Sequence, residues 1–222
     1  MPDRVKQAIF DMLASRFASP GALPPLFVAD VFAGGGSMGL EALSRGAAFC
    51  SFFERDRQAL EALRGNIDSL GAGQESRVVA GDAWRASMAM PTKLVREGIL
   101  APAALIFLDP PYRDCEDTSK RGAVRRFLER LVLRHSQTFG LGGMPKPGAS
   151  DEPTEGQTTR PRRERPGGSA GHRHGGASLG HATRLVVLHH PAGRRFVLTE
   201  DDPWRVVEER RIGSNAVTFF AS

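Results

Sequence analysis

One stretch decides the fold of this chain: Val28-Ala29-Asp30-Val31-Phe32-Ala33-Gly34-Gly35-Gly36-Ser37-Met38-Gly39. The apolar run from Leu26 to Phe32 predicts a strand, and a helix is predicted to begin near Ser37. Glycines at a strand-to-helix turn tolerate positive φ and let the backbone approach a ligand closely. The helix N-terminus beyond them presents free N–H groups. The stretch therefore predicts either an ordinary tight turn in an α/β domain or a ligand-binding loop.

The end of the next apolar run separates these two interpretations. Phe49 to Phe53 is followed at once by Glu54, where a doubly wound sheet carries an acidic residue for the two hydroxyls of a ribose. We therefore interpret the loop as a nucleoside-cofactor site. The spacing Gly34-x-Gly36-x-x-Gly39 also fits the dinucleotide fingerprint, so the loop does not by itself name the cofactor.

A second feature is Leu108-Asp109-Pro110-Pro111-Tyr112, after an apolar run from Ala103 to Leu108. Two successive prolines remove two N–H donors and fix the backbone after a buried strand. Ligands of open α/β sheets bind beyond the carboxyl ends of the strands, so Asp109 and the Pro110 carbonyl are predicted to face that crevice. Two acceptors beside an aromatic ring suit a planar base with an exocyclic amine. The competing interpretation is a proline-rich turn capped by Asp109.

Together these features resemble class I S-adenosylmethionine-dependent methyltransferases that act on amino groups of nucleic-acid bases. Four stretches narrow the resemblance to the bacterial 16S ribosomal RNA (guanine-N2) methyltransferase family: Asp3-Arg4-Val5-Lys6-Gln7-Ala8-Ile9-Phe10, the run from Asp30 to Ala47, the run from Leu108 to Tyr112, and Arg211-Ile212-Gly213-Ser214-Asn215-Ala216-Val217-Thr218-Phe219-Phe220. The similarity covers roughly residues 3–134 and 184–220.

The resemblance implies S-adenosylmethionine as the cofactor, together with a set of site residues. The expected cofactor-binding residues are Asp30, Phe32, Ala33, Gly34, Gly36, Gly39, Glu54, Arg55, Asp82 and Ala83. Asp82 would contact the adenine amine, and capping of the next turn is its competing interpretation. The expected catalytic residues are Asp109, Pro110, Pro111 and Tyr112, and the expected nucleic-acid contacts are Arg4 and Tyr112.

The start of the sequence departs from that family. Its members usually carry a glycine- and basic-rich stretch and a Pro-Thr pair before the Asp-Arg-Val motif, whereas this sequence opens with Met1-Pro2. We interpret this as an absent segment or a misassigned start, which affects the grip on the substrate and not the chemistry. Asp3 is predicted to cap a helix running to about Phe17.

The remaining periodicity predicts the fold class. Short apolar runs alternate with amphipathic helices up to the helix from Val124 to Leu133. The arginines of that helix, Arg125 among them, are expected on a solvated basic face. After the strand from Arg184 to His190, the runs Trp204 to Arg211 and Asn215 to Phe220 are joined through Gly213-Ser214 as an antiparallel pair. We predict a doubly wound, mostly parallel, seven-stranded α/β sheet with a C-terminal antiparallel hairpin, the Rossmann-like architecture of class I methyltransferases. His189 and His190 are expected as polar surface at a strand end.

Residues 139–183 differ in kind from the rest. Gly140 to His181 holds 11 Gly and 5 Pro in 42 positions, too few apolar groups to offset the entropy of ordering. We predict a single methyltransferase domain of residues 1–138 and 184–222, interrupted by a disordered Gly/Pro/Arg-rich insertion at 139–183. Histidines within the insertion have no partner cysteines or carboxylates at metal-binding spacing, so no metal site is expected.

Composition and charge restrict the partners. The net charge is +5, and the insertion holds six basic and four acidic residues, so the rest of the chain keeps +3. This balance suits an anionic partner, for which ribosomal RNA or an assembly intermediate of the small ribosomal subunit is expected. Two cysteines without a spacing pattern, no apolar signal segment and no run long enough to span a bilayer predict a cytoplasmic monomer without membrane contact.

Three alternatives stay open beside guanine N2. The crevice chemistry fits adenine N6 of DNA or RNA equally well, because both bases present an exocyclic amine. A non-catalytic RNA-binding module could keep the methyltransferase fold, although intact Glu54, Asp82 and Asp109 argue against decay. A nicotinamide oxidoreductase is disfavoured by the Asp-Pro-Pro-Tyr turn and by the terminal hairpin.

Overall fold

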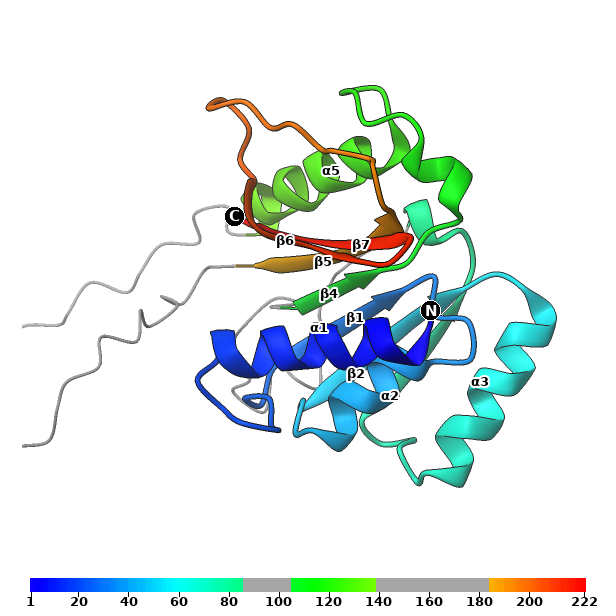
Figure 1. Cartoon of the computed structure of the whole chain (residues 1–222). Coiled ribbons are helices and arrows are strands. Elements are labelled where there is room, and N and C mark those ends of the chain that lie inside the picture. Colours follow the sequence, from blue (N-terminus) through cyan, green and yellow to red (C-terminus); the bar gives the residue numbers. More distant parts are fainter. Residues whose placement is uncertain (86–104, 139–183) are drawn as a thin grey trace, which may run out of the picture.

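The computed structural model describes residues 1–85, 105–138 and 184–222, which build one seven-stranded sheet (Figure 1). The strand order is β3-β2-β1-β4-β5-β7-β6. The first five strands in this order run parallel, and β7 is antiparallel to both β5 and β6. The predicted fold class is therefore confirmed. The strands are β1 (Phe27–Val31), β2 (Phe49–Glu54), β3 (Ser76–Ala80), β4 (Leu105–Leu108), β5 (Leu185–Pro191), β6 (Arg205–Ile212) and β7 (Asn215–Ala221).

Helices cover both faces of the sheet, which is why the central strands are apolar without alternation. One face packs against α1 (Asp3–Arg16), α2 (Ser37–Ser44) and α3 (Arg57–Ser69). The other face packs against α5 (Ala123–Thr138) and two short 3-10 turns, η1 (Ala83–Arg85) and η2 (Tyr112–Cys115). Phe196 and Trp204, from the segment that precedes β6, pack on the same face. Every residue of β1 and of β4 is buried between these layers.

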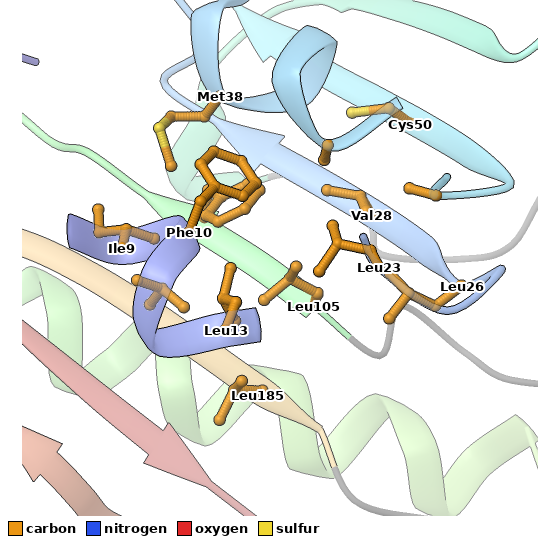
Figure 2. Packing of buried hydrophobic residues seen from close by; sticks show 14 of the residues in the cluster. Ile9, Phe10, Leu13, Leu23, Leu26, Val28, Met38, Cys50, Leu105 and Leu185 are labelled. Atoms are coloured by element: carbon orange, nitrogen blue, oxygen red, sulfur yellow. The ribbon is translucent and has the colours of Figure 1, made fainter. Parts of the chain in front are cut away.

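Helix α1 packs against the sheet because its apolar residues are spaced so that they lie on one side of the helix. Figure 2 shows Leu13 of α1 beside Leu105 of β4 and Leu185 of β5, and Phe10 of α1 directed toward Met38 of α2, all of them buried. The ring centroids of Phe10 and Phe107 are 5.7 Å apart. The amino end of α1 is thereby carried to the carboxyl edge of the parallel strands (Figure 1), where Met1 and Pro2 line a cavity.

Two sequence expectations about helices were wrong in detail. Asp3 does not cap α1; Pro2 occupies the cap position, and its carbonyl accepts the N–H groups of Val5 and Lys6 at 3.0 and 3.1 Å. Arg125, expected on a solvated basic face of α5, is buried and pairs with Asp202 at 2.6 Å. The pattern of α5 alone could not show this, because the partner lies in a loop far along the chain.

Two expectations fall at the limits of the described residues. The proposed disordered insertion at 139–183 and the first residues of the strand predicted from Ala103 lie outside them. Among residues 1–85, 105–138 and 184–222, no helix has the length and apolar character needed to cross a bilayer.

The strand order reverses between β1 and β4. From β1 the chain continues outward through β2 and β3, and it then returns to the other side of β1 as β4. The turns that follow β1 and β4 therefore diverge over the same edge of the sheet. In an open α/β sheet this is the position where ligands bind.

Candidate active site

A cavity of about 560 Å³ lies at this switch point. The volume falls within the range of ordinary small-molecule sites, about 300–1,000 Å³. The two features singled out in the sequence meet in its wall, one from each side. The lining residues are Met1, Pro2, Phe32, Glu54, Arg55, Asp56, Ala83, Asp109, Pro110, Pro111, Tyr112 and His189.

Glu54 closes the glycine loop from the neighbouring strand. Its Oε2 accepts the N–H of Gly34 at 2.9 Å, and its Oε1 accepts the N–H groups of Arg55 and Asp56 at 2.7 and 2.9 Å. These bonds fix the carboxylate at the cavity wall. Oε1 already accepts two N–H groups, whereas Oε2 accepts one and keeps a further lone pair for a ligand hydroxyl. Phe32 and Gly34 have φ values of 66° and 54°, so the chain turns sharply as it leaves β1.

Two further loop glycines, Gly36 and Gly39, are required by packing. A Cβ on Gly39 would lie 2.4 Å from the ring of Phe52 and 2.5 Å from the sulfur of Cys50. A Cβ on Gly36 would lie 2.4 Å from Leu63. These glycines let α2 sit directly on β2. Neither lines the cavity, nor do Ala33 and Gly34, so their predicted cofactor contacts stay predictions.

Asp30 lies beneath the loop, outside the cavity lining. Its Oδ2 accepts the N–H of Gly39 at 2.8 Å, which ties β1 to the first turn of α2. Burial raises the pKa of Asp30 to about 7; the Gly39 N–H opposes this rise, and the charges of Asp109 and Glu54 add to it. Its predicted cofactor contact is untested, and the structure gives the side chain a role in holding the loop.

Asp82 and Ala83 take different places. Ala83 is buried and lines the cavity. Asp82 is exposed, and its Oδ1 accepts the N–H of Trp84 at 3.0 Å, the capping contact of the competing interpretation. Trp84 packs edge-on against Phe32 and donates its Nε1–H to Asp114 at 3.1 Å, so it joins the floor of the cavity to η2. The sequence reasoning gave Trp84 no role.

The Asp-Pro-Pro-Tyr turn forms the opposite wall. The N–H of Asp109 donates to the carbonyl of Val31 at 3.3 Å, which holds the start of this turn beside the end of β1. Tyr112 stands 48% exposed at the cavity mouth, and its hydroxyl donates to Asn215 Oδ1 at 2.5 Å. Desolvation raises the pKa of Tyr112, and the negative charge of Asp109 raises it further.

The histidine pair corrects the sequence analysis. His189 and His190 are 2% and 0% exposed, so they are not surface groups. His189 bonds to Asp109, whereas His190 faces away and bonds through Nε2 to Thr218 at 2.8 Å. Burial lowers the pKa of His190. The available signal was a histidine directly after the apolar run from Leu185 to Leu188, since Asp109 has the same place after the apolar run of β4.

Arg4 does not line the cavity. It is exposed, two residues after Pro2, with its guanidinium beside Gly213 in the turn between β6 and β7. It contributes to a separate groove of about 440 Å³ between α1 and α2, lined by Asp3, Arg4, Lys6, Gln7, Phe10, Glu41 and Arg45. A contact from Arg4 to nucleic acid stays a prediction.

The charge of the cavity is predominantly acidic. Three carboxylates, those of Glu54, Asp56 and Asp109, line it together with two cationic groups, the Arg55 guanidinium and the N-terminal ammonium of Met1. Such a wall favours a positively charged ligand. Within the described part of the chain, no three His, Cys, Asp or Glu side chains gather as a metal site requires.

The chain is similar to several known proteins. A family model described as "Conserved hypothetical protein 95" matches residues 1–134. The chain is 37% identical over 112 residues to the "Putative rRNA methyltransferase YlbH" of Bacillus subtilis (strain 168), covering 50% of this chain and 54% of that protein. It is 37% identical over 111 residues to "Ribosomal RNA small subunit methyltransferase D" of Escherichia coli (strain K12), covering 50% and 48%. The chain thus spans about half the length of these curated relatives.

Two solved structures share the fold over nearly the whole chain. The "Putative methyltransferase yhhF from Escherichia coli" superposes with a TM-score of 0.58 at 21% identity, covering 99% of this chain and 86% of that one. An RNA methyltransferase from Salinibacter ruber, in complex with S-adenosyl-L-homocysteine, superposes with a TM-score of 0.51 at 12% identity, covering 100% and 92%. The sheet with its C-terminal hairpin is therefore a class I methyltransferase fold.

Proposed function

This chain belongs to the conserved hypothetical protein 95 family, and from that premise we propose that it transfers a methyl group from S-adenosylmethionine to ribosomal RNA of the small subunit. The acceptor is the exocyclic N2 amine of a guanine. The substrate is RNA or an assembly intermediate of the small subunit. Curated relatives named as rRNA methyltransferases support the substrate class, and the family resemblance supports the choice of guanine.

One observation carries the proposal: the carboxylate of Asp109 and the glycine loop's partner Glu54 line the same cavity. A reaction between a nucleoside cofactor and a base needs both ligands in contact. The cavity provides a ribose-binding acid on one wall and an amine-binding acceptor pair on the other. Neither wall alone would distinguish a methyltransferase from a generic nucleotide-binding domain.

The residues present fit S-adenosylmethionine. Glu54 keeps a lone pair on Oε2 for a ribose hydroxyl, and Phe32 and Ala83 offer apolar contacts for the adenine ring. The acidic lining suits a ligand with a sulfonium and an ammonium group. When bound, this cofactor supplies an electrophilic methyl group.

The chain's own residues act on the base. Asp109 accepts a hydrogen bond from one N–H of the amine and stabilises the positive charge that develops on nitrogen. The Pro110 carbonyl accepts the second hydrogen, so the nitrogen lone pair is directed at the methyl carbon. Tyr112 stacks on the base, which must leave its helix to reach the cavity. Positioning supplies most of the rate, because a sulfonium needs little activation.

Adenine N6 is the second candidate acceptor, because the Asp109-Pro110 acceptor pair fits either amine. The experiment incubates the protein with labelled S-adenosylmethionine and undermethylated small ribosomal subunits, and maps labelled nucleotides by mass spectrometry. Label in N2-methylguanine is expected. Label in N6-methyladenine would replace guanine by adenine, and no label in any nucleotide would leave a non-catalytic RNA-binding module.

A further inference from the structure

The register of the sheet places a histidine beside the proposed catalytic carboxylate. Leu108 of β4 pairs with Leu188 of β5 in parallel register, so the next residues, Asp109 and His189, lie side by side where this pairing ends. Asp109 follows the end of β4, whereas His189 is still within β5 and pairs with Val217 of β7. Strand β7 runs the other way against β5, which brings its first residue, Asn215, to the same edge opposite Pro191.

These residues form a continuous chain of polar contacts with Tyr112. His189 Nδ1 lies 2.7 Å from Asp109 Oδ1, and His189 Nε2 lies 3.0 Å from Asn215 Oδ1. Asn215 Oδ1 also accepts the Tyr112 hydroxyl at 2.5 Å. His189 and Asn215 are 2% and 5% exposed, so water does not compete for these bonds. These contacts connect the Asp109 carboxylate to the side chain of Tyr112, and both residues line the cavity.

Hydrogen-bond accounting fixes the direction of the contact with Asp109. An ionised carboxylate has no hydrogen to donate, so His189 Nδ1 carries the hydrogen that bridges to Oδ1. This assignment does not depend on how the Asn215 amide is turned. The Nε2 contact does depend on it: a hydrogen bond there requires either a hydrogen on both ring nitrogens, with Nε2–H donating to Oδ1, or a turned amide whose N–H donates to Nε2. With Oδ1 engaged, Oδ2 is the oxygen that forms an ion pair with the N-terminal ammonium of Met1, a residue of the cavity lining, at 3.7 Å. A base amine that bonds to Oδ2 would take the place of that ammonium.

We propose that His189 is a positioning residue for the transfer reaction: its Nδ1–H locks Asp109 with Oδ2 toward the base amine. Its Nε2 contact with Asn215 holds the Tyr112 side chain in register with that carboxylate. This inference rests on the proposed function, in which Asp109 accepts an N–H of the base. A buried, two-sided contact of this kind keeps a carboxylate from rotating, and a misplacement of about 1 Å can lower a rate about 100-fold.

The test compares two amide substitutions at one position. In H189N the side-chain amide nitrogen falls near the place of Nδ1, and in H189Q near the place of Nε2. We expect H189Q to lower kcat about 100-fold, because Asp109 loses its donor. We expect H189N to stay within about tenfold of the wild type, because only the outer contact is lost. KM and Kd for S-adenosylmethionine should not change in either variant.

H190Q is the matched control. It replaces the neighbouring buried histidine and keeps an amide donor for Thr218, and it should leave kcat unchanged. Equal rates for H189Q and H189N, or a loss in H189Q that appears as weaker cofactor binding, would overturn the proposal.

A second measurement tests the proposal even if the His189 variants do not fold, because it is made on the wild-type protein. Long-range ¹⁵N–¹H correlation spectra of the wild-type histidine ring should show a hydrogen on Nδ1 of His189 whose signal shifts in D109N. An unprotonated Nδ1 contradicts the proposal. If the wild type methylates no small-subunit RNA, the proposed function fails instead, and the ring spectra alone then decide whether His189 holds Asp109.

Discussion

The two walls of the cavity are built in different ways. On the glycine-loop side, side-chain carboxylates accept backbone N–H groups that are near in sequence: Gly39 bonds to Asp30, nine residues away, and Gly34 bonds to Glu54, twenty away. On the Asp-Pro-Pro-Tyr side, side chains bond to side chains across 80 and 103 residues, as Asp109 does with His189 and Tyr112 with Asn215.

We assign a different task to each wall: the glycine-loop wall binds the cofactor, and the Asp-Pro-Pro-Tyr wall positions the reacting base. Backbone donors are fixed once the strand and helix form, so the glycine-loop wall is shaped by local structure and suits an invariant ligand. The opposite wall depends on three strands and a 3-10 turn being assembled correctly, and it holds the groups that we assign to the reacting base. Mutations in the two walls should therefore affect different measured quantities.

The largest effect is expected at Asp109. D109A removes the acceptor of the base amine, and we expect methyl transfer to fall about 1,000-fold or more. Binding of S-adenosylhomocysteine, measured by calorimetry, should stay near the wild-type value because Glu54 and the loop are untouched. Lost cofactor binding in D109A would contradict the division between the two walls.

Gly39 tests the packing of the glycine-loop side. In G39A the new Cβ would meet Phe52 and Cys50 at 2.4 and 2.5 Å, so we expect overpacking. Such changes lower the free energy of unfolding by about 1–3 kcal/mol. G35A is the matched control, because its Cβ would meet only the Asn66 amide at 3.4 Å. Urea denaturation measures both, and equal stability of the two variants would show that α2 is not tightly seated on β2.

Glu54 tests cofactor affinity. E54Q keeps the length of the side chain and removes its charge, so hydrogen bonds to ribose weaken by about 1–2 kcal/mol. We expect Kd for the cofactor to rise about tenfold, with the transfer rate at saturating cofactor unchanged. A lower rate at saturating cofactor with an unchanged Kd would mean that Glu54 acts in the transfer step. The two walls would then not differ in function.

Asp30 tests the buried charge beneath the loop. In the unfolded chain its pKa is 3.8, whereas burial raises it to about 7 in the folded protein. The folded state thus binds more protons between these values, and stability falls as the pH rises through that window, on the order of 1 kcal/mol per pH unit. D30N keeps an oxygen for the Gly39 N–H and should lack this slope.

Denaturation of both proteins at about pH 5 and about pH 8 measures the difference in slope. The advantage of D30N over the wild type should be larger at the higher pH. Parallel curves for the two proteins would mean that Asp30 titrates normally.

The sequence by itself determined the architecture. Buried runs ending at Phe32 and Leu108, a glycine loop and an amphipathic α1 are local patterns, because strand and helix periodicity and backbone φ preferences act over a few residues. The terminal hairpin was predictable for the same reason, from Gly213-Ser214 between two strand-like runs. The resemblance then placed Glu54 and Asp109 on one edge of the sheet.

Only the tertiary structure decided how the side chains at that edge are used. His189 was expected at the surface and is buried against Asp109; Arg125 was expected in solvent and is paired with Asp202. Both partners are set by strand register and loop packing, which bring together residues about 80 positions apart. A side chain's exposure depends on what covers it, and a single strand or helix pattern does not contain that information.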